Sequence, residues 1–320
     1  MHIKKNMINK ELRGKYFPLK LLTKVVSKKW GINLMNFASR FSNGKGIKGI
    51  HSEEKYISSN NGGPDIRIRI FKPENMNEDL PIMLYCHGGG YIIGNPELAL
   101  SNIKDFINTR ACIVVAPDYR KALDAPFPAA LNDCYDTLLW VKENQKILGS
   151  KLNKFIVAGH SAGGGLTAAI TLKARDTRDV KIAFQLPIYP MIDDRQNTES
   201  AKNSNAPVWN SQTNQVGWNL YLKDLRQNKK AIPTYAAPAR NNDYSNFPPT
   251  ITFVGDMEPF KDETITYVKA LKKEGVPVDF KLYKGCFHGF EIVHPEALIS
   301  KKATAFLLDS FGRYMDTYYK

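Results

Sequence analysis

Residues 155–170 read FIVAGHSAGGGLTAAI and decide the fold class of the chain. The apolar run at 155–158 predicts a short buried strand, and the glycine- and alanine-rich residues after it predict a helix. Between them lies the pattern G-x-S-x-G, centred on Ser161. Its glycines permit a sharp, strained turn that exposes the serine oxygen, and the new helix directs its first N–H groups at developing negative charge. Ser161 is therefore a candidate nucleophile, with the Ala162 N–H as a candidate oxyanion donor.

Similar apolar runs recur along the chain and alternate with helical stretches. The expected buried strands are Ile82–Tyr85, Cys112–Ala116, Phe155–Ala158, Ile182–Leu186, Thr250–Val254 and Val278–Tyr283. The expected helices are Leu98–Thr109, Ala129–Gln145, Ala162–Arg175, Asp262–Glu274 and Glu296–Tyr314. This alternation indicates an α/β fold with a mostly parallel sheet, whose functional side chains lie at the carboxyl ends of the strands.

Two further stretches depart from this alternation. In Asp65–Phe71, every second residue is isoleucine and the residues between include Arg67 and Arg69. That pattern predicts an antiparallel edge strand with one face in water. The stretch 193–230 is polar and rich in Asn and Gln. An insertion of this length inside a compact domain is typical of a lid or binding element.

A second glycine motif follows the predicted strand that ends near residue 85. Residues 87–91 read HGGGY. Because glycine has no Cβ, this backbone can approach a substrate oxygen and aim its N–H groups at it. Gly88 and Gly89 are therefore candidate oxyanion donors beside Ala162, and we expect a hydrogen bond from His87 to hold the loop. The residues expected to support the site are His87, Gly90, Tyr91 and His160.

The candidate base and acid lie near the end of the chain. His288 follows the last predicted strand in a loop with glycine beside it, and it is the preferred base. The strand at 250–254 is followed by two acids in adjoining positions, Asp256 and Glu258. The next acids, at 262 and 263, suit the start of the following helix, where negative charge is favourable. At this point either Asp256 or Glu258 could orient the histidine.

Composition places the chain among ordinary globular proteins. Of its 320 residues, 43% are hydrophobic and 24% are charged, which excludes a disordered chain or a coiled coil. No run approaches 18 apolar residues, and lysines interrupt the only candidate for a secretory signal. The four cysteines form no C-x-x-C pair, which argues against a zinc site or a disulfide framework. We therefore expect a cytoplasmic protein.

The basic charge is concentrated at the N-terminus. The net charge is +14, and residues 1–50 hold twelve Lys and Arg against one acid, Glu11. Apolar residues recur among these lysines at nearly amphipathic helical spacing, so we expect a helix that packs on the body and exposes a charged face. The apolar residues are Leu21, Leu22, Val25, Val26, Trp30, Leu34, Met35 and Phe37. A membrane surface and nucleic acid remain as alternative partners for this arm.

Taken together, the motifs resemble the hormone-sensitive-lipase-like family of α/β-hydrolase esterases, which carry a triple-glycine oxyanion motif. The matching motifs are HGGGY at 87–91, DYR at 118–120, PFPAA at 126–130, GHSAG at 159–163, EPF at 258–260, DE at 262–263 and HGF at 288–290. The resemblance implies an α/β-hydrolase fold with a mostly parallel eight-stranded sheet, helices on both faces and a helical cap. It also implies that Glu258 is the triad acid. Residues 1–45 and the insertion 193–230 would form the cap on a domain of residues 46–320.

The chain departs from the usual family pattern at four points. The family usually has Asp where this chain has His160, Asn where it has Gly165, and Asp where it has Glu258. It also usually has Leu-Ala-Pro-Glu at 121–124, where this chain reads KALD. None of these departures removes a triad residue, but they predict a different serine environment or substrate preference.

The function implied by the resemblance is that of a serine carboxylesterase acting on short- to medium-chain esters. His288 would take the proton of Ser161, Glu258 would orient the imidazole, and the intermediate would be an acyl-enzyme. No metal or organic cofactor is expected. The expected partner is a small-molecule ester, without nucleic acid or stable membrane insertion, and a homo-oligomer is left open. The alternatives are an amidase or peptidase with the same triad, or a non-catalytic ligand-binding protein on this fold.

Overall fold

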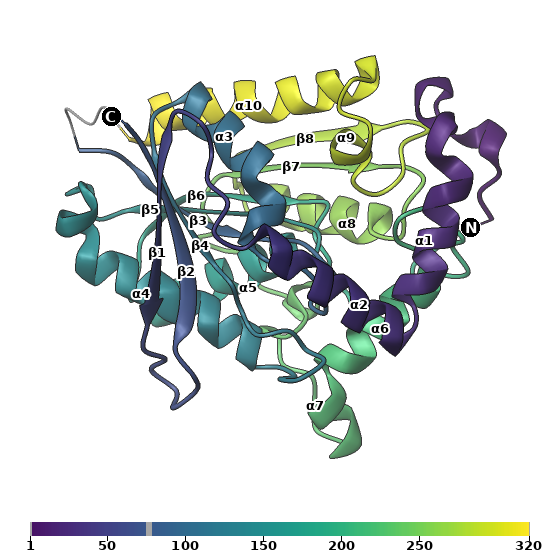
Figure 1. The fold of residues 1–320 in the computed structure, drawn as a ribbon, viewed down its shortest axis with the longest axis horizontal. Helices are drawn as coiled ribbons and strands as arrows, with labels where there is room; N and C mark the ends of the chain where they lie inside the picture. Colours follow the sequence, from purple (N-terminus) through teal and green to yellow (C-terminus); the bar gives the residue numbers. More distant parts are fainter. Residues whose placement is uncertain (1, 75–78, 320) are drawn as a thin grey trace.

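An eight-stranded sheet forms the centre of the computed structural model, which describes residues 2–74 and 79–319 (Figure 1). Its strands are β1 Ile50–Ile57, β2 Ile66–Pro73, β3 Ile82–Cys86, β4 Ile113–Pro117, β5 Phe155–His160, β6 Ile182–Ile188, β7 Thr250–Gly255 and β8 Val278–Tyr283. Their order across the sheet is β1-β2-β4-β3-β5-β6-β7-β8. Strands β3 to β8 run parallel, and β2 pairs antiparallel with both β1 and β4. The predicted mostly parallel α/β sheet is thus confirmed, with the ends of its six predicted strands no more than two residues from their expected positions.

Helices cover both faces of this sheet. They are α1 Tyr16–Val26, α2 Lys29–Ser39, α3 Leu100–Thr109, α4 Ala129–Leu148, α5 Ala162–Thr177, α6 Ser211–Tyr221, α7 Lys223–Gln227, α8 Lys261–Lys273, α9 Phe290–Val293 and α10 Leu298–Tyr318. Because side chains alternate along a strand, β3 contributes to two cores. Ile82 and Leu84 belong to a core shared with α4 and α5, whereas Met83 and Tyr85 belong to one shared with α3 and α10. Figure 1 shows α3 and α10 on one side of the sheet and α4, α5 and α8 on the other.

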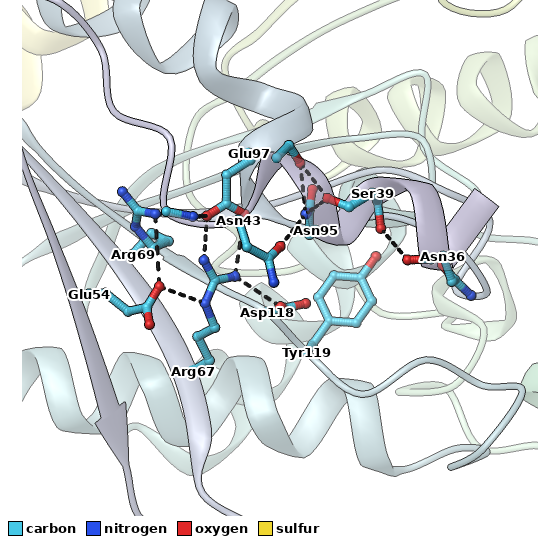
Figure 2. Close-up of polar contacts among 12 residues, drawn as sticks. Asn36, Ser39, Asn43, Glu54, Arg67, Arg69, Asn95, Glu97, Asp118 and Tyr119 are labelled. Carbon is cyan, nitrogen blue, oxygen red and sulfur yellow. Dashed lines mark hydrogen bonds and ion pairs between the residues drawn. The ribbon is translucent and has the colours of Figure 1, made fainter. Parts of the chain in front are cut away.

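The prediction that one face of the second strand lies in water is wrong. β2 lies inside the sheet beside β1, a strand that the sequence did not reveal, and both Arg67 and Arg69 are buried. Figure 2 shows that the guanidinium groups of both arginines meet the carboxylate of Glu97, whose side chain has no exposed surface. Glu54 and Asp118 add further ion pairs to Arg67. The arginines tolerate burial because each carries a nearby opposite charge.

The N-terminal segment is helical, as predicted, but its contacts with the body differ from the expected ones. Val26 and Ile32 do pack into the core. Five of the eight apolar residues expected to pack there are instead exposed, and these are Leu21, Leu22, Trp30, Leu34 and Phe37. The expectation failed because both sides of these helices carry apolar residues, so periodicity alone could not tell which side is covered.

Candidate active site

Ser161 lies in the turn between β5 and α5. Its backbone angles are φ 61° and ψ −120°, a conformation that L-residues rarely adopt. The glycines on either side are required by space: a Cβ on Gly159 would lie 2.5 Å from the carbonyl oxygen of Gly163, and one on Gly163 would lie 2.0 Å from that of Cys86. The turn therefore fits against the end of β3 only with this spacing of glycines, and it holds the serine at the carboxyl edge of the sheet.

The structure brings Ser161 and His288 together. The imidazole Nε2 of His288 lies 2.8 Å from the Ser161 Oγ, and its Nδ1 lies 2.5 Å from a carboxylate oxygen of Glu258. The second oxygen of Glu258 accepts a hydrogen bond of 3.1 Å from the Gly255 N–H. A carboxylate acts here as an acceptor, so Nδ1 carries the proton and Nε2 is free to accept the serine hydroxyl. All three side chains are buried.

The second candidate acid, Asp256, contacts the backbone of a neighbouring loop and not the imidazole. Its carboxylate accepts a hydrogen bond of 2.6 Å from the Gly285 N–H, and its own N–H donates to the Tyr283 carbonyl. These bonds connect the loop after β7 to the loop after β8. Burial raises the pKa of Asp256 above its ordinary value. Asp256 therefore braces the loop that carries His288, while Glu258 contacts the imidazole itself.

Aromatic rings that the sequence did not single out as site residues enclose the imidazole of His288. The ring of Tyr189 lies at 4.7 Å between centroids and that of Phe260 at 5.0 Å, both edge to face. The Tyr189 hydroxyl donates a hydrogen bond to the buried carboxylate of Glu291. Burial raises the pKa of Glu291 to about 7. Phe260 ends the EPF motif and Glu291 follows the HGF motif, but no local pattern predicts that either side chain packs around the imidazole.

The triple-glycine loop lies against the nucleophile. A Cβ on Gly88 would be 3.5 Å from the Ser161 Cβ. Gly89 and Gly90 have φ values of 124° and 61°, and a Cβ on Gly90 would lie 2.1 Å from the indole of Trp209. Gly89 and Gly90 thus require glycine for both conformation and space, whereas a Cβ at Gly88 would only crowd the His160 carbonyl oxygen, at 3.0 Å. The loop backbone is held near the serine without intervening side chains.

His87 contacts this loop through a hydrogen bond and is held by a stacked ring. Its Nδ1–H donates a hydrogen bond of 2.7 Å to the Gly88 carbonyl, and its ring stacks on Tyr119 at 4.1 Å. The Tyr119 hydroxyl donates to the His87 carbonyl at 2.8 Å. Burial lowers the pKa of His87 to about 3, so the ring is neutral at physiological pH. A neutral, stacked imidazole with these bonds positions the loop.

His160 lies behind the serine. Its Nδ1 accepts a hydrogen bond of 2.7 Å from the Tyr85 hydroxyl, and its ring lies 5.5 Å from that of Tyr189. Burial lowers the pKa of His160 to about 3. This residue therefore supports the turn through a buried, uncharged contact.

Tyr91 lies beside Gly165, the position at which the family resembled by the motifs usually has Asn. Its hydroxyl donates a hydrogen bond of 2.7 Å to the Met191 carbonyl, and its ring stacks on Tyr221 of α6 at 4.0 Å. A Cβ on Gly165 would lie 2.2 Å from that hydroxyl and 2.2 Å from the same carbonyl oxygen. The hydroxyl thus fills the space that a larger side chain at 165 would need.

Both stretches expected to form a cap contact residues in, or just after, the triple-glycine loop. In the insertion 193–230, Trp209 lies against Gly90, and its indole N–H donates to Asn214 at 3.1 Å. In α2, the Asn36 amide donates to the Ile92 carbonyl at 2.9 Å and accepts from the Gly94 N–H at 3.2 Å. These contacts connect two segments that are distant in sequence to one side of the site.

Within 2–74 and 79–319, no three or more His, Cys, Asp or Glu side chains cluster in a way that could hold a metal ion. In the same part of the chain, no helix is long and apolar enough to cross a membrane.

Sequence comparison identifies the family. Residues 83–292 match a family with the alpha/beta hydrolase fold. The chain belongs to this alpha/beta hydrolase family. Its relatives include the esterase LipI and the carboxylesterase NlhH of Mycobacterium tuberculosis. LipI is 30% identical over 75% of this chain and 76% of its own length, and NlhH is 31% identical over 74% and 75%.

Comparison with solved structures supports the same family. A bacterial heroin esterase superimposes on this chain with a TM-score of 0.84 and 28% identity, covering 97% of this chain and 98% of its own. The alpha/beta hydrolase fold predicted from the motifs is thereby confirmed. Together, the named esterases and this structure support carboxylic ester hydrolysis as the reaction of this alpha/beta hydrolase.

Proposed function

We propose that the chain is a serine carboxylesterase whose triad is Ser161, His288 and Glu258. The observation that carries the proposal is the continuous pair of hydrogen bonds, 2.8 Å from Ser161 to His288 and 2.5 Å from His288 to Glu258. A nucleophile bonded to a base, and a base oriented by a third group, form the arrangement that activates a serine.

The proposed reaction proceeds through an acyl-enzyme. The Ser161 Oγ attacks the ester carbonyl while His288 Nε2 takes the hydroxyl proton, and the imidazolium is stabilised by Glu258. The same proton then passes to the leaving alkoxide, which departs as the alcohol. Water next attacks the acyl carbonyl with His288 as base, which releases the acid and restores the serine. The enclosing rings of Tyr189 and Phe260 favour one orientation of the imidazole through both steps.

The oxyanion would be stabilised by backbone N–H groups of Gly88, Gly89 and Ala162. Support comes from the close approach of Gly88 to the serine and from the position of Ala162 as the first residue of α5. The start of a helix favours negative charge at this point. Donors of this kind in a water-excluded site stabilise the tetrahedral intermediate more than the ground state.

We further propose that residues 1–45 and 193–230 form a cap on the catalytic domain of residues 46–320 and limit the acyl chain to short or medium length. Trp209 at the triple-glycine loop is the bulky side chain that supports this limit. The proposed substrate is a small-molecule ester, and the proposed location is the cytoplasm.

One assay set tests the proposal. p-Nitrophenyl esters of increasing acyl length are compared with the p-nitroanilide of one matched acyl group, using the full chain. We expect efficient hydrolysis of the shorter esters, with turnover of the anilide lower by orders of magnitude. Preferred cleavage of the anilide would make the protein an amidase. Absence of turnover with every substrate would favour a non-catalytic binding protein.

A further inference from the structure

The outer surface of α1 and α2 carries large apolar side chains that are largely exposed. We call this surface the α1–α2 face. Its apolar residues are Phe17, Leu21, Leu22, Trp30, Leu34 and Phe37, together with Phe41 just after α2. Phe17 is 67% exposed and Phe41 is 74% exposed. Isolated apolar residues are normal on a protein surface, but a contiguous group marks an interaction site.

The spacing of these residues makes a regular stripe. Trp30, Leu34, Phe37 and Phe41 recur at helical intervals of four, three and four, and the rings of Phe37 and Phe41 meet edge to face at 5.4 Å. Ile32, on the other side of α2, is buried in the core. One side of the helix thus stabilises the fold, and the other side is left for a partner.

Positive charge surrounds this stripe. Residues 1–50 hold twelve basic residues and one acid, and Lys24, Lys28 and Lys29 are exposed beside the apolar side chains. Within the described residues 2–48, no Lys or Arg forms an ion pair with a carboxylate. The positive charge of this segment is therefore not neutralised by a carboxylate, although Arg13 and Lys15 donate hydrogen bonds to backbone carbonyls.

We propose that the α1–α2 face docks on the surface of an anionic lipid bilayer. Apolar and aromatic side chains would enter the boundary between headgroups and acyl chains, and the lysines would meet the headgroups. A second copy of the chain would bring the same positive charge to the contact. A nucleic acid would use the lysines but leave Leu34 and the phenylalanines in water. An anionic bilayer matches both the charge and the apolar stripe.

Docking through this face would also orient the catalytic domain. Asn36 of α2 is hydrogen-bonded to Ile92 and Gly94, which follow the triple-glycine loop. Asn95 donates to the Ser39 carbonyl at 2.8 Å, and Figure 2 shows these side chains joining the end of α2 to the body. The loop thus lies near the bilayer, where apolar esters accumulate. Only this consequence depends on the proposed esterase function, because the docking itself requires no catalysis.

Vesicle binding by the full chain tests the proposal. Flotation is measured with vesicles of phosphatidylglycerol and phosphatidylcholine in equal parts, and with pure phosphatidylcholine. We expect at least ~10-fold tighter binding to the anionic vesicles, weakening as salt rises from about 50 to about 200 mM. Trp30 provides a second readout, and its emission should shift to the blue on binding. Of the other three tryptophans, Trp209 and Trp218 are buried, and Trp140 of α4 is half-buried against the core. Equal binding to both vesicles, or no binding to either, would overturn the proposal.

A charge-introducing variant and a matched control locate the contact. Leu34→Glu with Phe41→Glu should weaken vesicle binding by at least ~10-fold, because both side chains would lose their apolar contact. Ile147→Glu on α4, where the native side chain is 79% exposed, should bind as the wild type does. Both variants should keep the helical circular-dichroism spectrum and the unfolding midpoint of the wild type. Unchanged vesicle binding by the double variant would overturn the proposal. So would a wild-type dimer that the double variant loses, since the occupant would then be a second copy.

Discussion

The carboxyl edge of the sheet and the α1–α2 face are opposite in construction. At the carboxyl edge, polar side chains are buried and paired, as in the contacts from Ser161 through His288 to Glu258. On the α1–α2 face, large apolar side chains such as Trp30 and Phe37 lie in water. Each arrangement is unfavourable unless something compensates it. At the edge the protein itself supplies hydrogen bonds, whereas for the face we propose that a lipid surface supplies the apolar contact.

Removing the nucleophile should have the largest effect. Ser161→Ala should lower kcat by about 10⁶, as in a well-studied serine protease, because no other group at the edge can form the acyl-enzyme. Circular dichroism should show an intact fold, and the exposed Ser101→Ala provides the control. Near-normal turnover by the Ser161 variant would mean that the buried polar edge is not the catalytic site.

Replacing the orienting carboxylate should have the next largest effect. Glu258→Gln should lower kcat by about 10⁴ at neutral pH, because an amide no longer selects the required imidazole tautomer. The matched variant is Asp256→Asn, which alters a loop-bracing carboxylate that accepts from Gly285. It should keep most activity and lose about 1 to 3 kcal/mol of stability. The reverse ranking on folded protein would transfer the orienting role to Asp256.

These two variants also show what the sequence could predict. Gly159, Gly163 and the triple glycine encode backbone conformations and close approaches, so the pattern itself fixes local geometry. The identity of the orienting acid was harder to predict. The residues alone left both Asp256 and Glu258 as candidates, and the family resemblance favoured Glu258. The structure brings Glu258 to the imidazole. Local motifs therefore predict the elements of the edge well.

Contacts between distant segments could not be predicted in this way. Arg67 and Arg69 looked like the wet face of an edge strand because their partner, Glu97, is about thirty residues away and carries no motif. Tyr189 reaches His288 only through the folded sheet. Likewise, the apolar spacing in α1 and α2 predicts helices with apolar residues, but it does not predict which side of each helix the rest of the chain covers.

The ion pairs of Glu97 with Arg67 and Arg69 are also buried and polar, but they lie outside the triad. They therefore test separately whether buried pairing stabilises the fold. Glu97→Gln should cost about 3 to 5 kcal/mol of unfolding free energy, because two buried guanidinium groups would lose their shared carboxylate. Denaturant unfolding measures this loss. Glu53→Gln, at a more exposed ion pair with Lys55, should change stability by less than ~1 kcal/mol. Equal losses of unfolding free energy in the two variants would show that burial of the Glu97 ion pairs adds nothing to stability.

The smallest expected effect concerns Glu291. Burial raises its pKa to about 7, so the folded state holds this proton more tightly than the unfolded state. Its contribution to stability is therefore greatest below the ordinary Glu pKa and falls as pH rises towards 7. Between pH 4.5 and 8 this fall amounts to on the order of 3 kcal/mol, and Glu291→Gln should remove it. The exposed Glu296→Gln should follow the wild-type profile, and an unchanged profile for Glu291→Gln would contradict the shift.

The central claim is that Ser161 is the nucleophile activated at the carboxyl edge, and covalent trapping tests it most directly. A fluorophosphonate is attacked at phosphorus by an activated serine oxygen, and fluoride leaves. Mass spectrometry of the intact protein and of its peptides locates the adduct. We predict one adduct, on Ser161, formed far more slowly in His288→Ala. An adduct on another residue, or labelling of Ser161 at the same rate without His288, would contradict the account.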